Sequence, residues 1–369
     1  MRILVTGGAG FIGSHLVREL SARGEEVVVL DSLDPQVHEG AEPHPPAGVE
    51  LIVGNVGDAV LVDRALRGVD CVIHLAAVVG VGQSMYDIER YVRENTLATA
   101  TLLERLVAPA DRPQRLVVAS SMSIYGEGEY NCPQHGPVAP QQRSVAQLAA
   151  RDWECRCPFC DDVAVPVGTR EGKQLQPTSV YAVTKRDHEE LALSVGGAYG
   201  VPTVALRFFN VYGPGQALSN PYTGVAAIFA SRLLNGNPPL IFEDGNQTRD
   251  FIHVSDIVRG ILAATERDEA VGRAINLGTG QATSVSKVAE VLSHELGVAV
   301  EPDLAGEFRA GDIRHCFADT NEARTKLGFE ATTTFEAGMR QLARWLEGQQ
   351  AVDRVERARL ELVERGLTL

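Results

Sequence analysis

Two side chains one helical turn apart, Tyr181 and Lys185, could together move a proton. They lie four residues apart in Tyr181-Ala182-Val183-Thr184-Lys185, and residues at this spacing share one face of a helix. A phenol with a pKa of about 10 is a poor base at neutral pH. A lysine cation beside it favours the phenolate and lowers that pKa. Because such pairs are common by chance, the prediction of a general base depends on a cofactor site close to them.

A serine, Ser121, follows the strand expected over Arg115–Ser120. Ligands bind at the carboxyl ends of parallel strands in open α/β sheets. Ser121 is therefore expected to hydrogen-bond the substrate hydroxyl that Tyr181 deprotonates.

A glycine-rich turn at the start of the chain predicts a dinucleotide site. Gly7, Gly10 and Gly13 follow an apolar strand and open a helix, and Asp31 ends the second strand 18 residues after Gly13. The glycines allow a tight turn, a close approach of the backbone to a pyrophosphate and close helix–strand packing. Asp31 can accept hydrogen bonds from a ribose and would repel a 2′-phosphate. With no cation in residues 32–34, NAD is favoured over NADP.

Residues after the neighbouring strands would complete this site. Asn55 and Val56 end the third strand, either at the adenine edge or as a plain strand end. Leu75, Ala76 and Ala77 follow the fourth strand and are small enough to let a dinucleotide lie along the sheet edge.

Two pairs of metal-ligand side chains lie between the expected catalytic residues. Cys132-x-x-His135 and Cys157-x-x-Cys160 are spaced as two halves of a tetrahedral zinc site. Cys155 is a fifth candidate and could replace His135, and the alternative is a surface loop with four free thiols, which would oxidise readily. A stretch so poor in apolar residues gains order from a metal. We expect a closed, structural zinc and an insertion that covers one side of the substrate pocket.

The coarse pattern of the chain predicts an α/β fold with a doubly wound parallel sheet of the Rossmann type. Short apolar runs alternate with helical patterns in the first half and then recur after an irregular stretch of about 50 residues. The expected strands are Arg2–Thr6, Glu26–Asp31, Glu50–Gly54, Asp70–Leu75, Arg115–Ser120, Pro202–Phe208 and Leu240–Phe242. The expected helices are Ile12–Arg23, Asp87–Val107, Tyr181–Tyr199, Thr223–Asn235 and Ser255–Thr265, with a final docking helix near the C-terminus.

These elements suggest four units. Residues 1–126, 176–212 and 252–273 would form the NAD-binding domain, and residues 127–175 the Cys/His-rich insertion. Residues 213–251 and 274–347 would form a smaller α/β substrate-binding domain, and residues 348–369 a C-terminal helix.

Composition limits the partners. A formal net charge of −14 argues against nucleic acid, because phosphate contacts need a basic face. No apolar stretch approaches 18 residues and no basic segment precedes the first strand, so neither a membrane span nor a secretory signal is expected. We therefore expect a cytoplasmic protein, in which six cysteines are not a disulfide framework.

Five motifs in order resemble the extended short-chain dehydrogenase/reductases, and within them the nucleotide-sugar epimerases of the NAD-dependent epimerase/dehydratase family. The resemblance covers nearly everything except about residues 127–176. The motifs are Gly7-x-x-Gly10-x-x-Gly13, Ser121 before Ile124-Tyr125-Gly126, Tyr181-x-x-x-Lys185, Arg207-Phe208-Phe209-Asn210-Val211-Tyr212-Gly213-Pro214 and Arg249-Asp250-Phe251-Ile252-His253-Val254.

The resemblance implies a reaction and a set of residues. Tyr181 would take a proton from a sugar hydroxyl while hydride passes from the same carbon to NAD, and the keto-sugar would turn over and recover the hydride on its other face. The implied cofactor residues are Gly7, Gly10, Phe11, Ile12, Gly13, Asp31, Asn55, Val56, Leu75, Ala76, Ala77, Asn95, Tyr181, Lys185 and Phe208. The implied substrate residues are Ser121, Ser123, Asn210, Val225, Arg249 and Arg314, of which Asn210, Arg249 and Arg314 would meet the diphosphate.

The same resemblance narrows the chemistry. Sugar dehydratases of this family carry Asp-Glu where this chain has Met122 and Ser123, so dehydration is disfavoured and C4 epimerisation of a dTDP-6-deoxyhexose through a 4-keto intermediate is expected. Met122 would suit a 6-deoxy methyl group or would pack under the sheet edge. A UDP-hexose or UDP-uronic acid epimerase and a 4-keto-sugar reductase stay open. A catalytically silent module and a zinc hydrolase are disfavoured. Relatives pair through the equivalents of Asp87–Val107 and Tyr181–Tyr199, which implies a homodimer.

Overall fold

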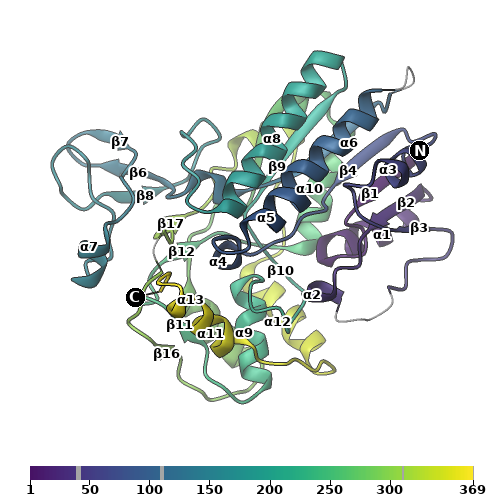
Figure 1. Cartoon of the computed structure of the whole chain (residues 1–369). Coiled ribbons are helices and arrows are strands. Elements are labelled where there is room, and N and C mark those ends of the chain that lie inside the picture. The colour runs from purple at the N-terminus through teal and green to yellow at the C-terminus, as the bar shows by residue number, and fades with distance from the viewer. Residues whose placement is uncertain (39–42, 109–111, 310, 369) are drawn as a thin grey trace.

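The computed structural model describes residues 1–38, 43–108, 112–309 and 311–368. A seven-stranded sheet runs through the larger part of the molecule (Figure 1), and every neighbouring pair of its strands is parallel. The strand order is β14-β9-β5-β4-β1-β2-β3, which confirms the doubly wound α/β fold. The strands are β1 (Arg2–Thr6), β2 (Glu26–Asp31), β3 (Glu50–Val53), β4 (Cys71–His74), β5 (Arg115–Ser121), β9 (Thr203–Phe208) and β14 (Arg273–Leu277).

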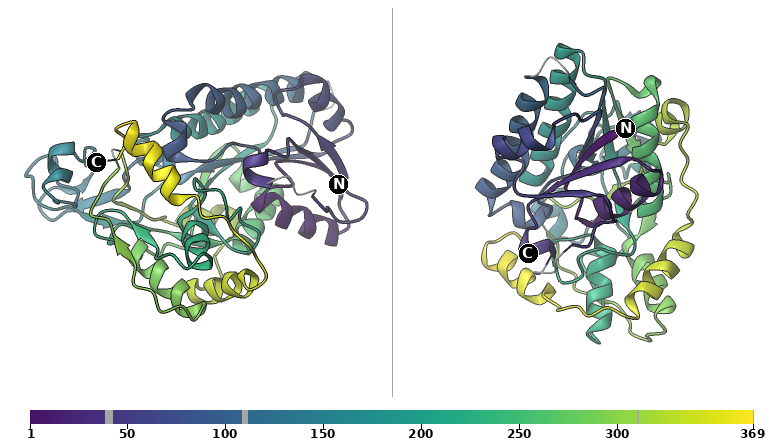
Figure 2. Two further views of the ribbon diagram at one scale, coloured as in Figure 1. Left: turned by 60° about the horizontal axis from the view of Figure 1, so that its bottom comes forward. Right: turned by 90° about the vertical axis from the view of Figure 1, so that its right-hand side faces the viewer.

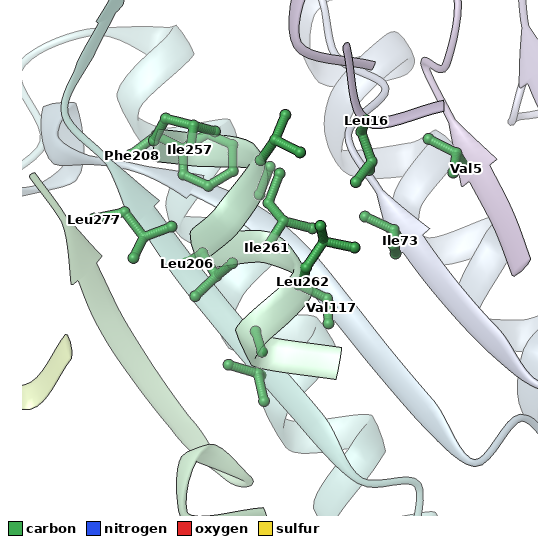
Figure 3. Close-up of a cluster of buried hydrophobic side chains, with 14 of the residues drawn as sticks. Val5, Leu16, Ile73, Val117, Leu206, Phe208, Ile257, Ile261, Leu262 and Leu277 are labelled. Carbon is green, nitrogen blue, oxygen red and sulfur yellow. The ribbon is translucent and has the colours of Figure 1, made fainter. Parts of the chain in front are cut away.

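Helices cover both faces of this sheet, because alternate side chains of each strand point to opposite faces and both sets are apolar. On one face, Val5, Ile73 and Val117 of the strands pack with Leu16 of α1 and Ile261 of α10, as Figure 3 shows. The opposite face packs against three further helices. The covering helices are α1 (Phe11–Ala22) and α10 (Val254–Glu266) on the first face, and α3 (Ala59–Ala65), α6 (Ala98–Val107) and α8 (Val180–Tyr199) on the second.

The helix expected over Asp87–Val107 is divided into three parts. It comprises α5 (Ile88–Tyr91), a stretch of π-helix η1 (Val92–Leu97) and α6. The π-helical turn contains Asn95, which is fully buried and whose amide bonds both backbone groups of Val78 and the hydroxyl of Thr184. Apolar periodicity alone cannot distinguish this widened turn from α-helix.

A second group of helices has a hydrophobic core of its own. The cluster joins Phe229 of α9 (Val225–Leu234), Leu292 of α11 (Val285–Glu295) and Leu342 of α12 (Phe335–Leu346). These helices belong to the segments expected to form the substrate-binding domain, whose boundaries stay a prediction. Short strands border them: β10 (Asn210–Tyr212), β11 (Leu240–Ile241), β12 (Thr248–Arg249), β13 (Phe251–His253), β15 (Thr283–Ser284), β16 (Asp303–Leu304) and β17 (His315–Cys316).

The cysteine-rich insertion forms a small antiparallel sheet that projects from one end of the molecule in Figure 1. Its strands are β6 (Glu129–Cys132), β7 (Gly136–Val138) and β8 (Val165–Val167). The short helix α7 (Val145–Ala149) lies between β7 and β8 in the sequence. Its core contains Tyr130, Val138 and Ala164 together with the buried cysteines. So small a core is consistent with a segment that needs a further source of order.

The last helix is α13 (Val355–Glu364), the yellow helix that Figure 2 shows beside the second group of helices. The remaining short helices are α2 (Pro35–His38), α4 (Val81–Ser84), η2 (Met122–Tyr125), η3 (Asp268–Ala270) and η4 (Ala323–Leu327). Among the described residues, no helix combines the length and apolarity that crossing a bilayer requires.

Candidate active site

The glycine turn between β1 and α1 is built without room for side chains. A Cβ on Gly13 would lie 2.1 Å from the carbonyl oxygen of Gly7, and one on Gly7 would lie 2.8 Å from the backbone nitrogen of Ala76. Gly7 also has φ +70°, a conformation that favours glycine. This packing brings the turn, the N-terminus of α1 and the end of β4 together. The resulting cradle fits the pyrophosphate of a dinucleotide.

Asp31 stands at the end of β2 beside this turn. Its carboxylate accepts hydrogen bonds from the backbone N–H groups of Ala9 and Leu33, and Nε2 of His38 lies 3.7 Å from it. Burial opposes its ionisation, but the interaction with His38 and the two backbone hydrogen bonds hold the pKa of Asp31 below its usual value. The carboxylate is therefore available to a ribose. His38, seven residues after Asp31, was not among the expected site residues.

The expected catalytic side chains converge between β5 and α8. Tyr181 and Lys185 both lie on the buried face of α8, and Ser121 ends β5. Burial raises the pKa of Tyr181 to about 12, and the smaller effect of Ser121, which favours the phenolate, acts in the opposite direction. The ammonium of Lys185 donates to the carbonyl oxygen of Ala119, 3.0 Å away.

Lys185 is held in a closed, apolar setting. Burial lowers its pKa to about 7, and Nδ1 of His188 lies 3.5 Å from its Nζ. The His188 ring stacks on that of His74, with centroids 5.2 Å apart, and His74 in turn bonds the hydroxyls of Thr6 and Thr99. Burial also lowers the pKa of both histidines, that of His74 to about 3. A neutral imidazole thus lies beside the lysine, and a second one packs against the first.

The residues after Ser121 do not form an acid–base pair. Ser123 donates its hydroxyl to Oγ of Ser121 at 2.9 Å, and its backbone N–H points to the same oxygen. Met122 is 7% exposed and packs with Tyr125 and Phe209. Of the two expectations for Met122, the structure favours packing over contact with a sugar methyl group.

Arg249 and Arg309, both beside Asp312, form a second polar group, called here the cationic corner. Arg249 on β12 donates to the carbonyl oxygens of Ile313 (2.5 Å) and Arg314 (3.1 Å) and lies 3.4 Å from the carboxylate of Asp312. Asp312 also accepts from Arg309, whose guanidinium lies 4.8 Å from the ring centroid of Phe242 and is 40% exposed. Arg309 was not expected at this site. Its three-residue spacing from Asp312, the acid with which it pairs, is the signal that could have found it.

Arg314, expected beside Arg249, is in a different position. It has no exposed surface, and its guanidinium donates to Glu154, Glu243 and Asp244. The expectation that Arg314 meets the diphosphate is therefore corrected, because an arginine enclosed by three carboxylates has no free donor for a ligand.

Asp250, next to Arg249 in the sequence, accepts hydrogen bonds from the backbone N–H groups of Thr279 and Gly280 and so anchors the cationic corner.

Several further expected residues lie at or just after strand ends or at the start of a helix. Oδ1 of Asn210 is buried and has no hydrogen-bond partner within the described part of the chain, which suits a ligand contact. Asn55 bonds Glu94 and the backbone of Gly57, whereas Val56 packs into the core. Others lie as follows: Phe208 is buried at the end of β9, Val225 is half-buried at the start of α9, and Leu75 to Ala77 are half-buried after β4.

The two cysteine-containing turns of the insertion meet. The candidate ligand atoms of Cys132, His135, Cys157 and Cys160 lie within 4.8 Å of one another. Sγ of Cys132 is 3.7 Å from Sγ of Cys160 and 3.5 Å from Nδ1 of His135, and Sγ of Cys157 is 3.6 Å from that nitrogen. Zn–S bonds of about 2.3 Å and Zn–N bonds of about 2.0 Å at tetrahedral angles place two sulfur atoms roughly 3.8 Å apart and a sulfur and a nitrogen atom roughly 3.5 Å apart. Cys155 lies outside this cluster, beside Tyr130 and Glu127.

A parallel sheet with a glycine cradle, an acid at the end of β2 and a Ser–Tyr–Lys group at the end of β5 defines the class of NAD-dependent enzymes that oxidise or reduce a hydroxyl-bearing carbon. Within that class the family is shown directly. The model of the NAD dependent epimerase/dehydratase family matches residues 3–147 and 161–278. The chain belongs to this family and is an enzyme of its NAD-dependent nucleotide-sugar epimerase group.

Relatives with assigned activities resemble the whole chain. It is 37% identical over 359 residues to a dTDP-L-rhamnose 4-epimerase of Burkholderia thailandensis, covering 96% of each chain. A solved UDP-glucose 4-epimerase of Thermotoga maritima with UDP-glucose superposes with a TM-score of 0.77 at 28% identity, covering 94% of this chain and 99% of that one. A UDP-glucuronic acid 4-epimerase of Bacillus cereus, solved with UDP-glucuronic acid and NAD, gives a TM-score of 0.73 at 26% identity with the same coverage.

Proposed function

We propose that this chain is an NAD-retaining epimerase that inverts C4 of a dTDP-6-deoxyhexose. The observation that carries the proposal is the meeting of Ser121 and Tyr181 beside the buried Lys185, in a chain that is 37% identical to a dTDP-L-rhamnose 4-epimerase. Solved relatives that bind UDP-glucose and UDP-glucuronic acid support a second candidate, a 4-epimerase of a UDP-hexose or UDP-uronic acid.

The cofactor side of the proposal rests on the cradle. The crowding at Gly7 and Gly13 leaves backbone N–H groups at the start of α1 for a pyrophosphate, and the carboxylate of Asp31 is placed for a ribose. When bound, the nicotinamide supplies the acceptor and donor of a hydride. The dinucleotide would stay bound between turnovers, since one epimerisation returns the hydride it removes.

The chain's own residues would move the proton. Oη of Tyr181 takes the proton of the C4 hydroxyl and later returns it to the C4 oxygen. Ser121 donates to that oxygen and is oriented by the hydroxyl of Ser123. Lys185 would supply the positive charge that offsets burial of the phenolate, since burial alone raises the pKa of Tyr181 to about 12. A 4-keto sugar results and must turn within the pocket before it is reduced on its other face.

The diphosphate would be held at the cationic corner. We assign this role to Arg249 and Arg309, with the unpartnered oxygen of Asn210 directed to a donor on the nucleotide or sugar. Asp312 bonds both guanidinium groups and so sets their spacing. Arg309 replaces Arg314 in the assignment, because Arg309 alone of these two retains exposed surface.

The assay that tests the function is an incubation without added coenzyme. The purified chain is given in turn a dTDP-6-deoxyhexose, a UDP-hexose and a UDP-hexuronate, and C4 epimers are resolved by NMR. We expect turnover of the first, and a Tyr181→Phe variant that keeps its NAD but turns over more slowly by a factor of about 10²–10⁴. Undiminished turnover in Tyr181→Phe would refute the assigned base.

We further propose that Cys132, His135, Cys157 and Cys160 hold a structural zinc. The separations of their ligand atoms match tetrahedral Zn–S and Zn–N bonds, and four protein ligands leave no position for a catalytic water. Metal analysis should find about one zinc per wild-type chain and per Cys155→Ala chain, but little in Cys160→Ala. Less than about half an equivalent in the wild type would contradict the site.

We propose a homodimer that pairs through α5, η1 and α8. Ile88, Val92 and Val183 are 52%, 44% and 45% exposed on these elements, which pack against one another. Apolar side chains that are exposed together on neighbouring helices favour a protein partner.

A further inference from the structure

One acidic residue of the insertion, Glu154, lies at the boundary between the cysteine cluster and the cationic corner. It stands three residues before Cys157, and its carboxylate contacts Arg314 and His315. The match to the family model is interrupted over residues 148–160. That interruption contains Glu154 and one of the two cysteine turns, so this contact is an addition to the family fold.

Glu154 bonds two consecutive side chains of the body of the protein. Its Oε1 accepts from Nε (3.1 Å) and Nη2 (2.5 Å) of Arg314, and its Oε2 lies 3.1 Å from Nε2 of His315. The hydrogen bond from His315 and the charge of Arg314 lower the pKa of Glu154 to about 2. Glu154 thus stays ionised at every pH at which the chain would work.

Arg314 transmits this contact to the cationic corner through the backbone. The carbonyl oxygens of Ile313 and Arg314 both accept hydrogen bonds from Arg249, as does that of Thr248. A second contact from the insertion has the same target, because Arg143 donates to the carbonyl oxygen of Asp312 at 3.1 Å. The orientation of Arg249 therefore depends on a loop whose side chains and backbone are held by the insertion.

The cysteine cluster fixes the segment that carries Glu154. Backbone hydrogen bonds join Ala164 to Cys155 and Cys157 to Asp162, which closes a short loop directly after Glu154. A metal at the cluster would tie this loop to the β6–β7 turn that contains Cys132 and His135. Binding free energy becomes ordering of the segment, since its own core is too small to order it.

We propose that Glu154 is a positioning residue for diphosphate binding, and that the metal bound by the insertion sets the affinity for a nucleoside diphosphate through it. The proposal rests on the proposed function for the identity of the ligand. It requires that loss of the metal and loss of the Glu154 charge both weaken diphosphate binding by disrupting the same contacts, those of Glu154 with Arg314 and His315.

A double-mutant cycle tests this coupling. Calorimetric titration with dTDP and with UDP, which needs no turnover, is applied to the full-length chain with its NAD in four forms: wild type, Glu154→Gln, Cys160→Ala and the double variant. The control is Asp152→Asn, which removes the same charge two residues away from an exposed pair with Arg156 inside the insertion. NAD content of each form reports whether the sheet domain has folded.

We expect each single variant to bind about tenfold more weakly, and the double variant to bind about tenfold rather than about a hundredfold more weakly, because the two changes share one route. Asp152→Asn should bind as the wild type does. The kcat for epimerisation should fall less than KM rises, and Glu154→Asp should recover part of the affinity. Wild-type affinity in Glu154→Gln, equal loss in Asp152→Asn, or full additivity in the double variant would overturn the proposal. A wild type that binds the diphosphate but epimerises no sugar would instead refute the proposed function.

Discussion

Lys185 carries an ammonium group into a region that water does not reach. Its Nζ has a carbonyl oxygen and a neutral imidazole as neighbours, and burial lowers its pKa to about 7 from an ordinary value near 10.5. A buried ammonium group destabilises the folded chain. It also places a positive charge beside Tyr181. Burial of this kind is typical of functional sites.

The sign of this effect predicts a pH dependence. Between pH 7 and about 10 the unfolded chain binds a proton that the folded chain has released, so stability rises with pH; below pH 7 both forms are protonated and the cost is constant. Lys185→Met should therefore stabilise the NAD-free chain at pH 7, and its advantage should shrink by roughly 1 kcal/mol per pH unit toward pH 9. Denaturant unfolding at several pH values measures it.

Lys287 on α11 provides the control for that experiment. Its ammonium is exposed and pairs with Glu290, so Lys287→Met should show no such trend. An advantage of Lys185→Met that stays constant with pH would contradict the burial of a titrating lysine.

At this scale, short-range spacing predicted some residues well and others poorly. Tyr181 and Lys185 are one turn apart on a single helix, so their shared face follows from the sequence. The choice between Arg309 and Arg314 does not, because it depends on carboxylates at positions 154, 243 and 244 that only the fold brings together. A sequence motif identifies the arginine, but the acidic side chains around it in the fold determine whether its guanidinium can bind a ligand.

Among the elements, the β1–α1 unit shows how close packing builds the cofactor site. Gly13→Ala would place a methyl group 2.1 Å from the carbonyl oxygen of Gly7, with only backbone to give way. We expect a loss of roughly 3 kcal/mol in unfolding free energy and loss of bound NAD. Gly197→Ala on α8, where a Cβ meets nothing within 4 Å, should instead add roughly 0.5–1 kcal/mol. Retained NAD in Gly13→Ala would contradict the cradle.

The elements themselves were predictable where hydrophobic patterns are regular. Six of the seven strands of the main sheet were expected within about one residue of their ends, because fully buried parallel strands are continuously apolar. The edge strand β14 was not predicted, and the seventh expected strand, Leu240–Phe242, forms β11 outside this sheet. The insertion was not, since β6, β7 and β8 are three or four residues long and face a core made largely of cysteines. The interruption at η1 also escaped prediction, because it follows from a long-range contact of Asn95 with Thr184.

For the whole molecule, the apolar side chains on α5, η1 and α8 bear on assembly. Ile88→Glu would place a charge in the proposed dimer interface, where Ile88 is 52% exposed in the single chain. We expect the variant to sediment as a monomer while wild type sediments as a dimer, because a charge buried at an interface without a partner is costly. Val60→Glu, at a residue that is 76% exposed on α3 and lies outside the proposed interface, should leave the dimer intact; a monomeric wild type would contradict the proposal. A cytoplasmic location stays a prediction.

The central claim is that one sugar carbon loses and regains the same hydride. The most direct measurement uses a dTDP-6-deoxyhexose with deuterium at C4, incubated with the purified chain and no added coenzyme. The account predicts a C4 epimer that keeps nearly all of its deuterium at C4, with none in the solvent. An absolute requirement for added NADH or NADPH, or a product with hydrogen at C4, would contradict it.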